Sequence, residues 1–275
     1  MDDATNAIYS AILVEEEGTD STFRGLLETF SARGLPCSLY TDRGSHYFHT
    51  PEAGGKVDRE HLTQVGRALA HLGVEHIAAY SPQARGRSER MFGTLQDRLV
   101  KELALTGLAD IETANAWLKE VWLPAHNARF AVKPAFPDDA FVPVADTSAL
   151  TETLCRHEDR VVARDNTVAF ENKRLQLPES PLRHHWVGAK VRIHAYPCSS
   201  LAVFHGPRLL ARYAADGRLL ASPARVTASP AKSAASRRAL ALNRQTQGPE
   251  RRQAPPQNRR SGKPKPSEAS PAPPS

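Results

Sequence analysis

Two carboxylates in this sequence of 275 residues are notable for what surrounds each of them. Asp42 ends a short apolar run and is followed at once by Arg43 and Gly44, which is typical of a strand that ends in a turn. Glu89 follows 46 intervening residues later, in a stretch rich in arginine. Carboxylates bind Mg²⁺ or Mn²⁺, and two such ions neutralise the charge at the attacking and leaving oxygens in phosphoryl transfer. The pair therefore indicates metal-assisted chemistry on phosphodiesters.

An alternation of strand and helix patterns positions Asp42. The expected elements are a buried strand over residues 8–14, an amphipathic helix from Thr19 that Gly34 ends, and a strand over residues 35–42. Strand, helix and strand in this order predict a sheet with parallel members, in which ligands bind at the carboxyl ends of the strands. Asp42 stands at such an end. Taken alone, however, Asp42 is more often explained as a structural residue in an Asx turn with Gly44.

Glu89 falls on a long helix expected over residues 87–103. Before that helix we expect a polar loop over residues 46–59, a helix ending at Gly73 and a strand over residues 74–80. The apolar stripe of the long helix consists of Met91, Phe92, Leu95, Leu99 and Leu103. At 100° per residue, Glu89 lies about 80° from the centre of this stripe, from where it can point along the seam between helix and sheet. An ordinary solvated glutamate is the alternative.

Three arginines cluster where this helix begins, namely Arg85, Arg87 and Arg90. Cations at a helix N-terminus oppose the helix macrodipole, so the cluster favours a polyanion as binding partner. His46 and His49 lie close to Asp42 in sequence and are further possible metal ligands, although loop histidines are usually solvent-exposed.

The remainder of the chain changes character twice. A helix begins at Asp110 and is expected to end at Pro124, and a proline-rich stretch then predicts a domain boundary near residue 145. Short strands with tight turns follow, which predict a small all-β module, and we expect it to be a barrel. The expected strands cover residues 160–163, 167–171, 173–177, 190–195, 201–205 and 209–213.

The basic charge of the chain belongs to its tail. Residues 225–275 hold 11 of the 36 lysines and arginines but 2 of the 30 acidic residues, so residues 1–224 carry a balance of −3. The tail is rich in proline, serine and arginine and is expected to be disordered, and such arms bind nucleic acid by releasing counterions. A solubilising extension is the alternative. No apolar run is long enough to span a membrane. The three cysteines are far apart and match no zinc spacing, which suits a reducing cytosol. We expect them to be buried or half-buried free thiols.

Three stretches resemble the catalytic core of integrases and insertion-sequence transposases of the DDE type. Tyr40-Thr41-Asp42-Arg43-Gly44-Ser45-His46-Tyr47 is similar to the strand that carries the second aspartate of that core. The stretch from Ser81 to Leu95 is similar to its Pro-x-x-x-Gly-x-x-Glu helix, and Asn127-Ala128-Arg129-Phe130 resembles the Asn-x-x-Arg exit from its last helix. The resemblance covers residues 1–145 and is closest to the ISNCY group.

The resemblance implies an α/β fold that is ribonuclease-H-like. Residues 1–145 would form the catalytic core, 146–222 a small β-barrel domain and 223–275 the disordered basic tail. The implied activity is DNA transposition by metal-dependent phosphodiester cleavage and strand transfer, without a covalent enzyme intermediate. Asp42 and Glu89 would be the catalytic ligands of two Mg²⁺ or Mn²⁺ ions, and DNA ends and target DNA the partners of a homo-oligomer. Arg43, Arg85, Arg87 and Arg90 would contact DNA phosphates. The implied location of the protein is the bacterial cytoplasm, at the nucleoid.

The sequence departs from this family at its start. The family has its first catalytic aspartate on the first core strand, whereas Met1-Asp2-Asp3-Ala4-Thr5 corresponds to the end of the second strand. Asp2 or Asp3 could substitute only from the wrong strand. We therefore expect a core truncated at its N-terminus and catalytically incompetent. The alternative is a DNA-binding protein without chemistry, acting through the β barrel and the basic tail.

Overall fold

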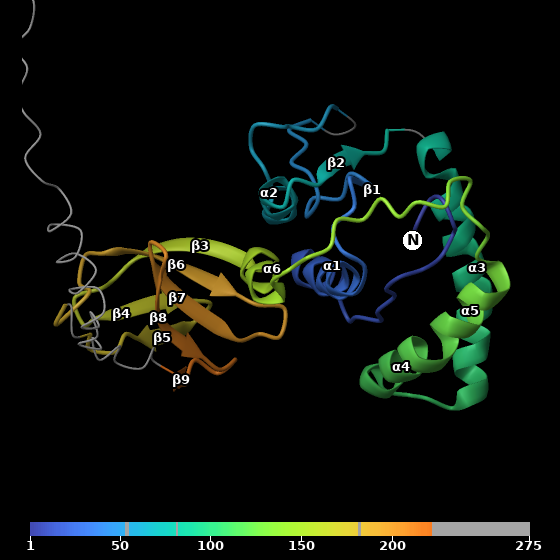
Figure 1. Ribbon diagram of the computed structural model, residues 1–275. Helices are drawn as coiled ribbons and strands as arrows, with labels where there is room; N and C mark the ends of the chain where they lie inside the picture. The colour runs from blue at the N-terminus through green and yellow to red at the C-terminus, as the bar shows by residue number, and fades with distance from the viewer. Residues whose placement is uncertain (53–54, 81, 181–182, 222–275) are drawn as a thin grey trace, which may run out of the picture. The chain divides into compact units, whose positions relative to one another are not determined.

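The structure is a computed structural model that describes residues 1–52, 55–80, 82–180 and 183–221, without the side chains of residues 82–85, 87 and 221. The fold is mixed α/β (Figure 1). The expected disordered tail, residues 223–275, lies outside the described part. Among the described residues, no helix combines the length and the apolar character that crossing a membrane requires.

Helices dominate the first part of the described chain. Its elements are α1 (Thr19–Arg33), β1 (Ser38–Thr41), α2 (Gln64–His71), β2 (Glu75–Ala78), α3 (Pro82–Thr106), α4 (Ile111–Trp117), the π-helical turn η1 (Leu118–Trp122), α5 (Leu123–Phe130) and α6 (Thr147–Thr153).

A parallel strand pair is present, but it does not involve the strand that was expected over residues 8–14. β1 and β2 form a two-stranded parallel sheet, with Thr41 opposite Ala78. Helix α1 ends at Gly34 as expected, where φ is +99° and an added Cβ would lie 2.4 Å from the carbonyl oxygen of Val142. Only glycine tolerates both conditions. Apolar side chains of α1 and α2 form a common core with α6, and its buried members include Phe23, Phe30, Val65, Leu69, Leu150 and Leu154.

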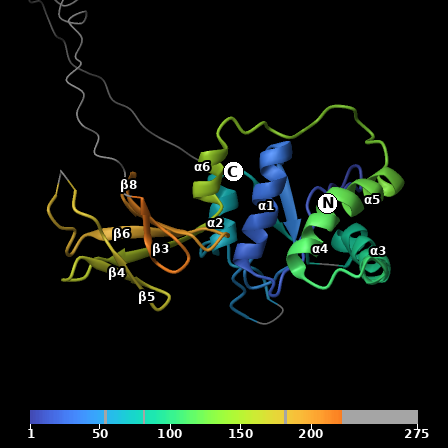
Figure 2. The same cartoon turned by 90° about the horizontal axis from the view of Figure 1, so that it is seen from below.

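The strand expected over residues 8–14 was wrong. The segment belongs to no strand, and its apolar side chains Ile8, Ala11 and Leu13 pack instead against α3, η1 and α5. Figure 2 shows α3, α4 and α5 gathered in one helical layer. An apolar run becomes a strand only when a neighbouring strand pairs with its backbone. Here asparagine side chains take that place, as described below.

Helix α3 begins earlier than expected, at Pro82, and ends at Thr106. Proline suits the first turn of a helix because the N–H that it lacks would have no intrahelical partner there. Met91, Leu95 and Leu99 pack inward as expected, but Phe92 is 54% exposed and does not belong to the buried stripe.

Pro124 does not end the helix that Asp110 caps, which corrects a second expectation. The chain widens into η1 and continues as α5 with Pro124 in its first turn. A π turn shifts the hydrogen-bond pattern by one residue, so the proline falls at a new helix start.

Seven strands, called here the β module, make up residues 156–221. They are β3 (Arg156–Val161), β4 (Thr167–Phe170), β5 (Lys173–Gln176), β6 (Lys190–Ala195), β7 (Leu201–His205), β8 (Arg208–Tyr213) and β9 (Leu219–Ala221). The antiparallel sheet has the order β3-β6-β7-β8-β9, and β4 and β5 form a separate hairpin. Val168, Phe170 and Leu175 of the hairpin share one buried core with Ile193, Val203 and Tyr213 of the sheet. A closed barrel stays a prediction.

Candidate functional site

Asp42 directly follows β1, where its carboxylate shapes the turn. Its Oδ1 accepts a hydrogen bond from the Gly44 N–H at 3.0 Å, which is the Asx turn that the sequence left open as the structural alternative. An added Cβ on Gly44 would lie 3.1 Å from this same oxygen and 3.1 Å from Cε1 of His46. The glycine therefore lets the backbone approach the Asp42 carboxylate closely, and the carboxylate has a defined orientation.

The parallel pair brings two chain segments to one sheet edge. The N–H of Ala79 donates to the carbonyl oxygen of Thr41 at 3.0 Å, so β1 and β2 leave the sheet at the same edge. Asp42 is the next residue after one strand, and the helix α3 begins four residues after the other. Glu89 follows the α3 start by seven residues, about 10 Å along the helix axis. Its side chain is exposed.

His76 of β2 is connected to the backbone of the Asp42 turn through the hydroxyl of Thr41. No pattern in the sequence indicated this role. The Thr41 hydroxyl donates its proton to the carbonyl oxygen of Asp42 at 3.0 Å, so the Nε2–H of His76 donates to the Thr41 oxygen at 2.9 Å. The Phe48 ring stacks on His76 with 4.1 Å between centroids. Burial lowers the pKa of His76 to about 4, which keeps this imidazole neutral at physiological pH.

Arg43 has a structural partner as well as a place beside Asp42. Its guanidinium donates to the carbonyl oxygen of Gly55 at 3.0 Å and lies over the ring of Tyr80, 5.2 Å from the centroid. The Tyr80 hydroxyl in turn accepts the N–H of Val57 at 3.1 Å. Arg43 and Tyr80 thereby fold the polar loop back toward the sheet edge, which sequence patterns do not reveal because the contacts depend on the loop path.

The other predicted phosphate contacts lie on α3. Arg90 is exposed and donates from Nε to the carbonyl oxygen of Gly86 at 3.0 Å, one turn earlier. The side chains of Arg85 and Arg87 lie outside the described part of the structure.

The histidines near Asp42 do not join a ligand cluster with it. Within the described ranges, the group of three or more potential metal ligands with donor atoms within 4.8 Å of one another is Cys155, His157 and His194. His46 lies 3.8 Å from a carboxylate oxygen of Glu17, and His49 is exposed. Of the three cysteines, Cys155 is buried as expected, whereas Cys37 and Cys198 are exposed, contrary to expectation.

The carboxylate of Asp2 hydrogen-bonds residues of its own N-terminal segment. Its carboxylate accepts hydrogen bonds from the hydroxyls of Thr5 at 2.5 Å and Tyr9 at 3.2 Å. Burial by itself would raise the pKa of Asp2, but these hydrogen bonds and those from the backbone outweigh it and lower the pKa.

Asn127, the first residue of the stretch Asn127-Ala128-Arg129-Phe130, holds the segment that precedes α1. Its carboxamide accepts the N–H of Ile8 and donates to the carbonyl oxygen of Ile8, both at 2.9 Å. Asn115 does the same with Leu13, at 2.7 and 2.9 Å. Both amides substitute for a neighbouring strand.

Comparison with known proteins gives two relatives, both named as transposases, while no family model matches the chain. It is 36% identical over 204 residues to "Putative transposase y4bF" of Sinorhizobium fredii, an alignment that covers 74% of this chain and 44% of that protein. It is 28% identical over 173 residues to "Transposase for insertion sequence IS1202" of Streptococcus pneumoniae, covering 63% of this chain and 37% of the relative. The chain thus spans less than half the length of either relative.

Proposed function

We propose that this chain acts in DNA transposition and that Asp42 and Glu89 bind the metal ions of a phosphodiester-cleaving site. The observation that carries the proposal is the parallel β1–β2 pair, which brings Asp42 and the start of the Glu89 helix to one sheet edge. The similarity to two proteins named transposases supports the same reaction class.

A ribonuclease-H-like core is part of this proposal. A parallel strand pair with α1 and α2 packed together, followed by the long α3, fits the corresponding half of such a core. The fold alone does not specify a reaction, so the proposal rests on the two carboxylates.

The donor set fits Mg²⁺ or Mn²⁺. Both ions prefer oxygen ligands, and a carboxylate offers about four lone-pair positions. The Asx turn to Gly44 engages Oδ1 of Asp42 and orients the carboxylate at the end of β1. When bound, such ions stabilise charge on the attacking and leaving oxygens. The chain itself would position them, and Arg90 and the arginines at the start of α3 would hold the DNA phosphates.

We further propose that Asp2 does not supply the remaining carboxylate of such a site. The resemblance implies a third carboxylate on another strand, and Asp2, the nearest substitute in sequence, is engaged by Thr5 and Tyr9. A homo-oligomer on DNA ends is the assembly that this function would use.

The alternative is DNA binding without chemistry, and the charge of the β module favours it. Residues 156–221 contain 11 lysines and arginines against 6 acidic residues, a balance of +5. Arg164, Lys190 and Arg208 are among its exposed cations. A net positive charge favours salt-dependent binding to phosphate backbones.

Nicking of supercoiled plasmid with Mn²⁺, measured together with DNA binding, tests the proposal. Any cleavage by the chain should disappear in Asp42→Asn and Glu89→Gln and persist in Glu120→Gln, an exposed helical glutamate on η1. Arg90→Ala should lower the slope of binding against salt by about 1 if Arg90 contacts a phosphate. Salt-sensitive binding with no Mn²⁺ bound and no effect of either carboxylate variant would instead support the non-catalytic alternative.

A further inference from the structure

A second set of metal-ligand side chains lies where α6 meets the sheet of the β module. Cys155 lies two residues after the end of α6 and directly before β3, His157 belongs to β3, and His194 of β6 is the register partner of His157. Side chains two residues apart on an extended chain point to one face, so Cys155 and His157 share the face to which His194 also belongs. One donor atom from each lies within 4.8 Å of the others. Cys155 and His194 are buried and His157 is half-buried.

Glu152 of α6 contacts one ring nitrogen of each histidine. His157 Nε2 lies 3.0 Å from the Glu152 carbonyl oxygen, and His194 Nδ1 lies 2.7 Å from Oε2 of the Glu152 side chain. Both oxygens can only accept, so both of these ring nitrogens carry the proton. The remaining nitrogens, Nδ1 of His157 and Nε2 of His194, are then the ones with a lone pair. Metal-binding histidines are oriented in this way, by a carbonyl or carboxylate on the other nitrogen.

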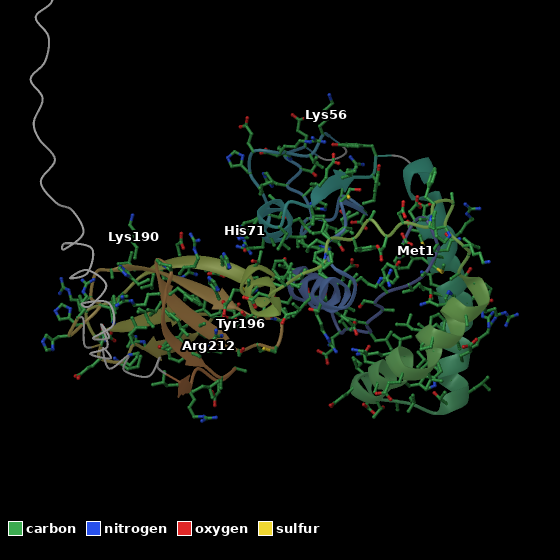
Figure 3. The ribbon with its side chains drawn as sticks, in the orientation of Figure 1. Met1, Lys56, His71, Lys190, Tyr196 and Arg212 are labelled. Atoms are coloured by element: carbon green, nitrogen blue, oxygen red, sulfur yellow. The ribbon has the colours of Figure 1, made fainter. Side chains whose placement is uncertain are left out.

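The Glu152 carboxylate is itself fixed by the sheet. It accepts the Tyr196 hydroxyl at 2.5 Å and the Arg212 guanidinium at 2.7 Å, and Arg212 also donates to the Tyr196 oxygen at 3.1 Å. Figure 3 labels Tyr196, which directly follows β6, and Arg212, which belongs to β8. Tyr196 and Arg212 therefore orient the carboxylate that contacts His194.

We propose that Cys155, His157 and His194 form a binding site for a zinc-like divalent ion, with a water molecule in the fourth position. A ligand set of one sulfur and two imidazole nitrogens favours Zn²⁺ over Mg²⁺. A Cys155 thiolate and the Glu152 carboxylate would together offset the two charges of the ion. The site differs in place and donor chemistry from Asp42 and Glu89, so the two can fail independently.

Binding requires two local changes. The Cys155 thiol, which donates to the carbonyl oxygen of Glu152 at 3.2 Å, must give up its proton and this hydrogen bond, and one imidazole must turn. The rings of His157 and His194 stack with 4.0 Å between centroids and 14° between planes. Two lone pairs directed at one ion must converge, whereas those of parallel rings do not, so one imidazole must turn about its hydrogen bond to Glu152. The site would link β3 to β6, and Glu152 would connect it to α6 through its contacts with both histidines.

Titration of the metal-free full chain with Co²⁺ tests this site, because a cobalt–thiolate bond gives a charge-transfer band in the near ultraviolet. We expect the band to saturate at one Co²⁺ per chain and to disappear when Zn²⁺ is added. Cys155→Ala should remove it, and His194→Gln should weaken binding by about tenfold or more. Circular dichroism of each variant establishes that it is folded.

The exposed thiols provide the matched controls. Cys37→Ala and Cys198→Ala should keep the band unchanged, as should Asp42→Asn. Absence of a band in the wild-type chain would overturn the site. A band that survives Cys155→Ala, or one that Cys37→Ala or Cys198→Ala removes, would do the same.

Discussion

The side-chain amide of Asn127 hydrogen-bonds both backbone polar groups of Ile8, a residue 119 positions earlier in the chain. A backbone N–H and C=O are normally satisfied together by an adjacent strand. Asn127 satisfies both from α5, and Asn115 satisfies those of Leu13 from α4. The two asparagines thereby attach the segment before α1 to the helices α4 and α5.

Asn127→Ala should destabilise the protein by about 1–3 kcal/mol, because it leaves the part-buried N–H and C=O of Ile8 without partners. Asn127→Asp should be similarly destabilising, since a carboxylate accepts from the N–H but cannot donate to the C=O. Urea unfolding measures both, with Gln96→Ala on the exposed face of α3 as the control. Equal stability of Asn127→Ala and the control would contradict this role.

Gln64→Ala should loosen the contact between α2 and β3. Gln64 donates to the carbonyl oxygen of His157 at 2.8 Å and accepts its N–H at 3.0 Å, so its side chain pairs with β3 at the edge of the sheet. We expect faster amide hydrogen exchange at His157 in the variant. The N–H of Val203, in the centre of the sheet, is the internal reference, and an unchanged ratio of the two exchange rates would refute the contact.

The described helices were largely predictable, and the reasons are local. Helix α1 has a glycine stop, and the side chain of Asp110 caps α4 by accepting the N–H of Thr113 at 2.8 Å. Five strands of the β module were also located correctly, and asparagines with positive φ, at Asn166 and Asn172, mark two turns of the module. The strand expected over residues 160–163 was misplaced, because β3 spans Arg156–Val161. Strand β9 and helix α6 were missed.

What could not be predicted depends on distant partners. The segment 8–14 has the pattern of a strand, and only the positions of Asn115 and Asn127 in space make it something else. His76 and Tyr80 support the Asp42 loop through contacts that a sequence pattern does not encode. The spacing Cys155-x-His157 was a signal that could have indicated a shared strand face, but its third member comes from β6.

The half-buried His76 should make the protein less stable in mild acid. Burial lowers its folded-state pKa to about 4, below the ordinary value of 6.5, so the unfolded chain binds more protons between these two pH values. The stability that neutral His76 contributes is complete above pH 6.5 and is lost as the pH falls toward 4. The slope from this residue is at most about 1.4 kcal/mol per pH unit.

His76→Gln should reduce that slope in unfolding measurements made between pH 6.5 and 4. Burial also lowers the pKa of His157 to about 4, so some slope should persist in the variant. His184→Gln, at an exposed position, should leave the slope unchanged. If the unfolding free energy of His76→Gln kept the wild-type slope against pH, His76 would not be a half-buried neutral group that resists protonation.

Gly44→Ala should disturb the Asp42 carboxylate without removing it. The new Cβ would lie 3.1 Å from Oδ1, closer than most Cβ contacts, so the carboxylate or the turn must shift by a few tenths of an ångström. We expect weaker Mn²⁺ binding than in the wild type, though stronger than in Asp42→Asn. Gly93→Ala on α3, where an added Cβ meets nothing within 4 Å, is the matched control. Unchanged Mn²⁺ affinity in Gly44→Ala would argue against Asp42 as a ligand.

Whether Asp42 and Glu89 bind a metal ion together is tested most directly by titration of the chain with Mn²⁺, followed through the electron paramagnetic resonance signal of free Mn²⁺. Mn²⁺ favours oxygen ligands, so the cysteine and histidine cluster should contribute little. We predict that Asp42→Asn and Glu89→Gln each weaken binding by at least about tenfold, while Glu120→Gln leaves it unchanged. Mn²⁺ binding equal to wild type in both carboxylate variants would contradict the proposed site.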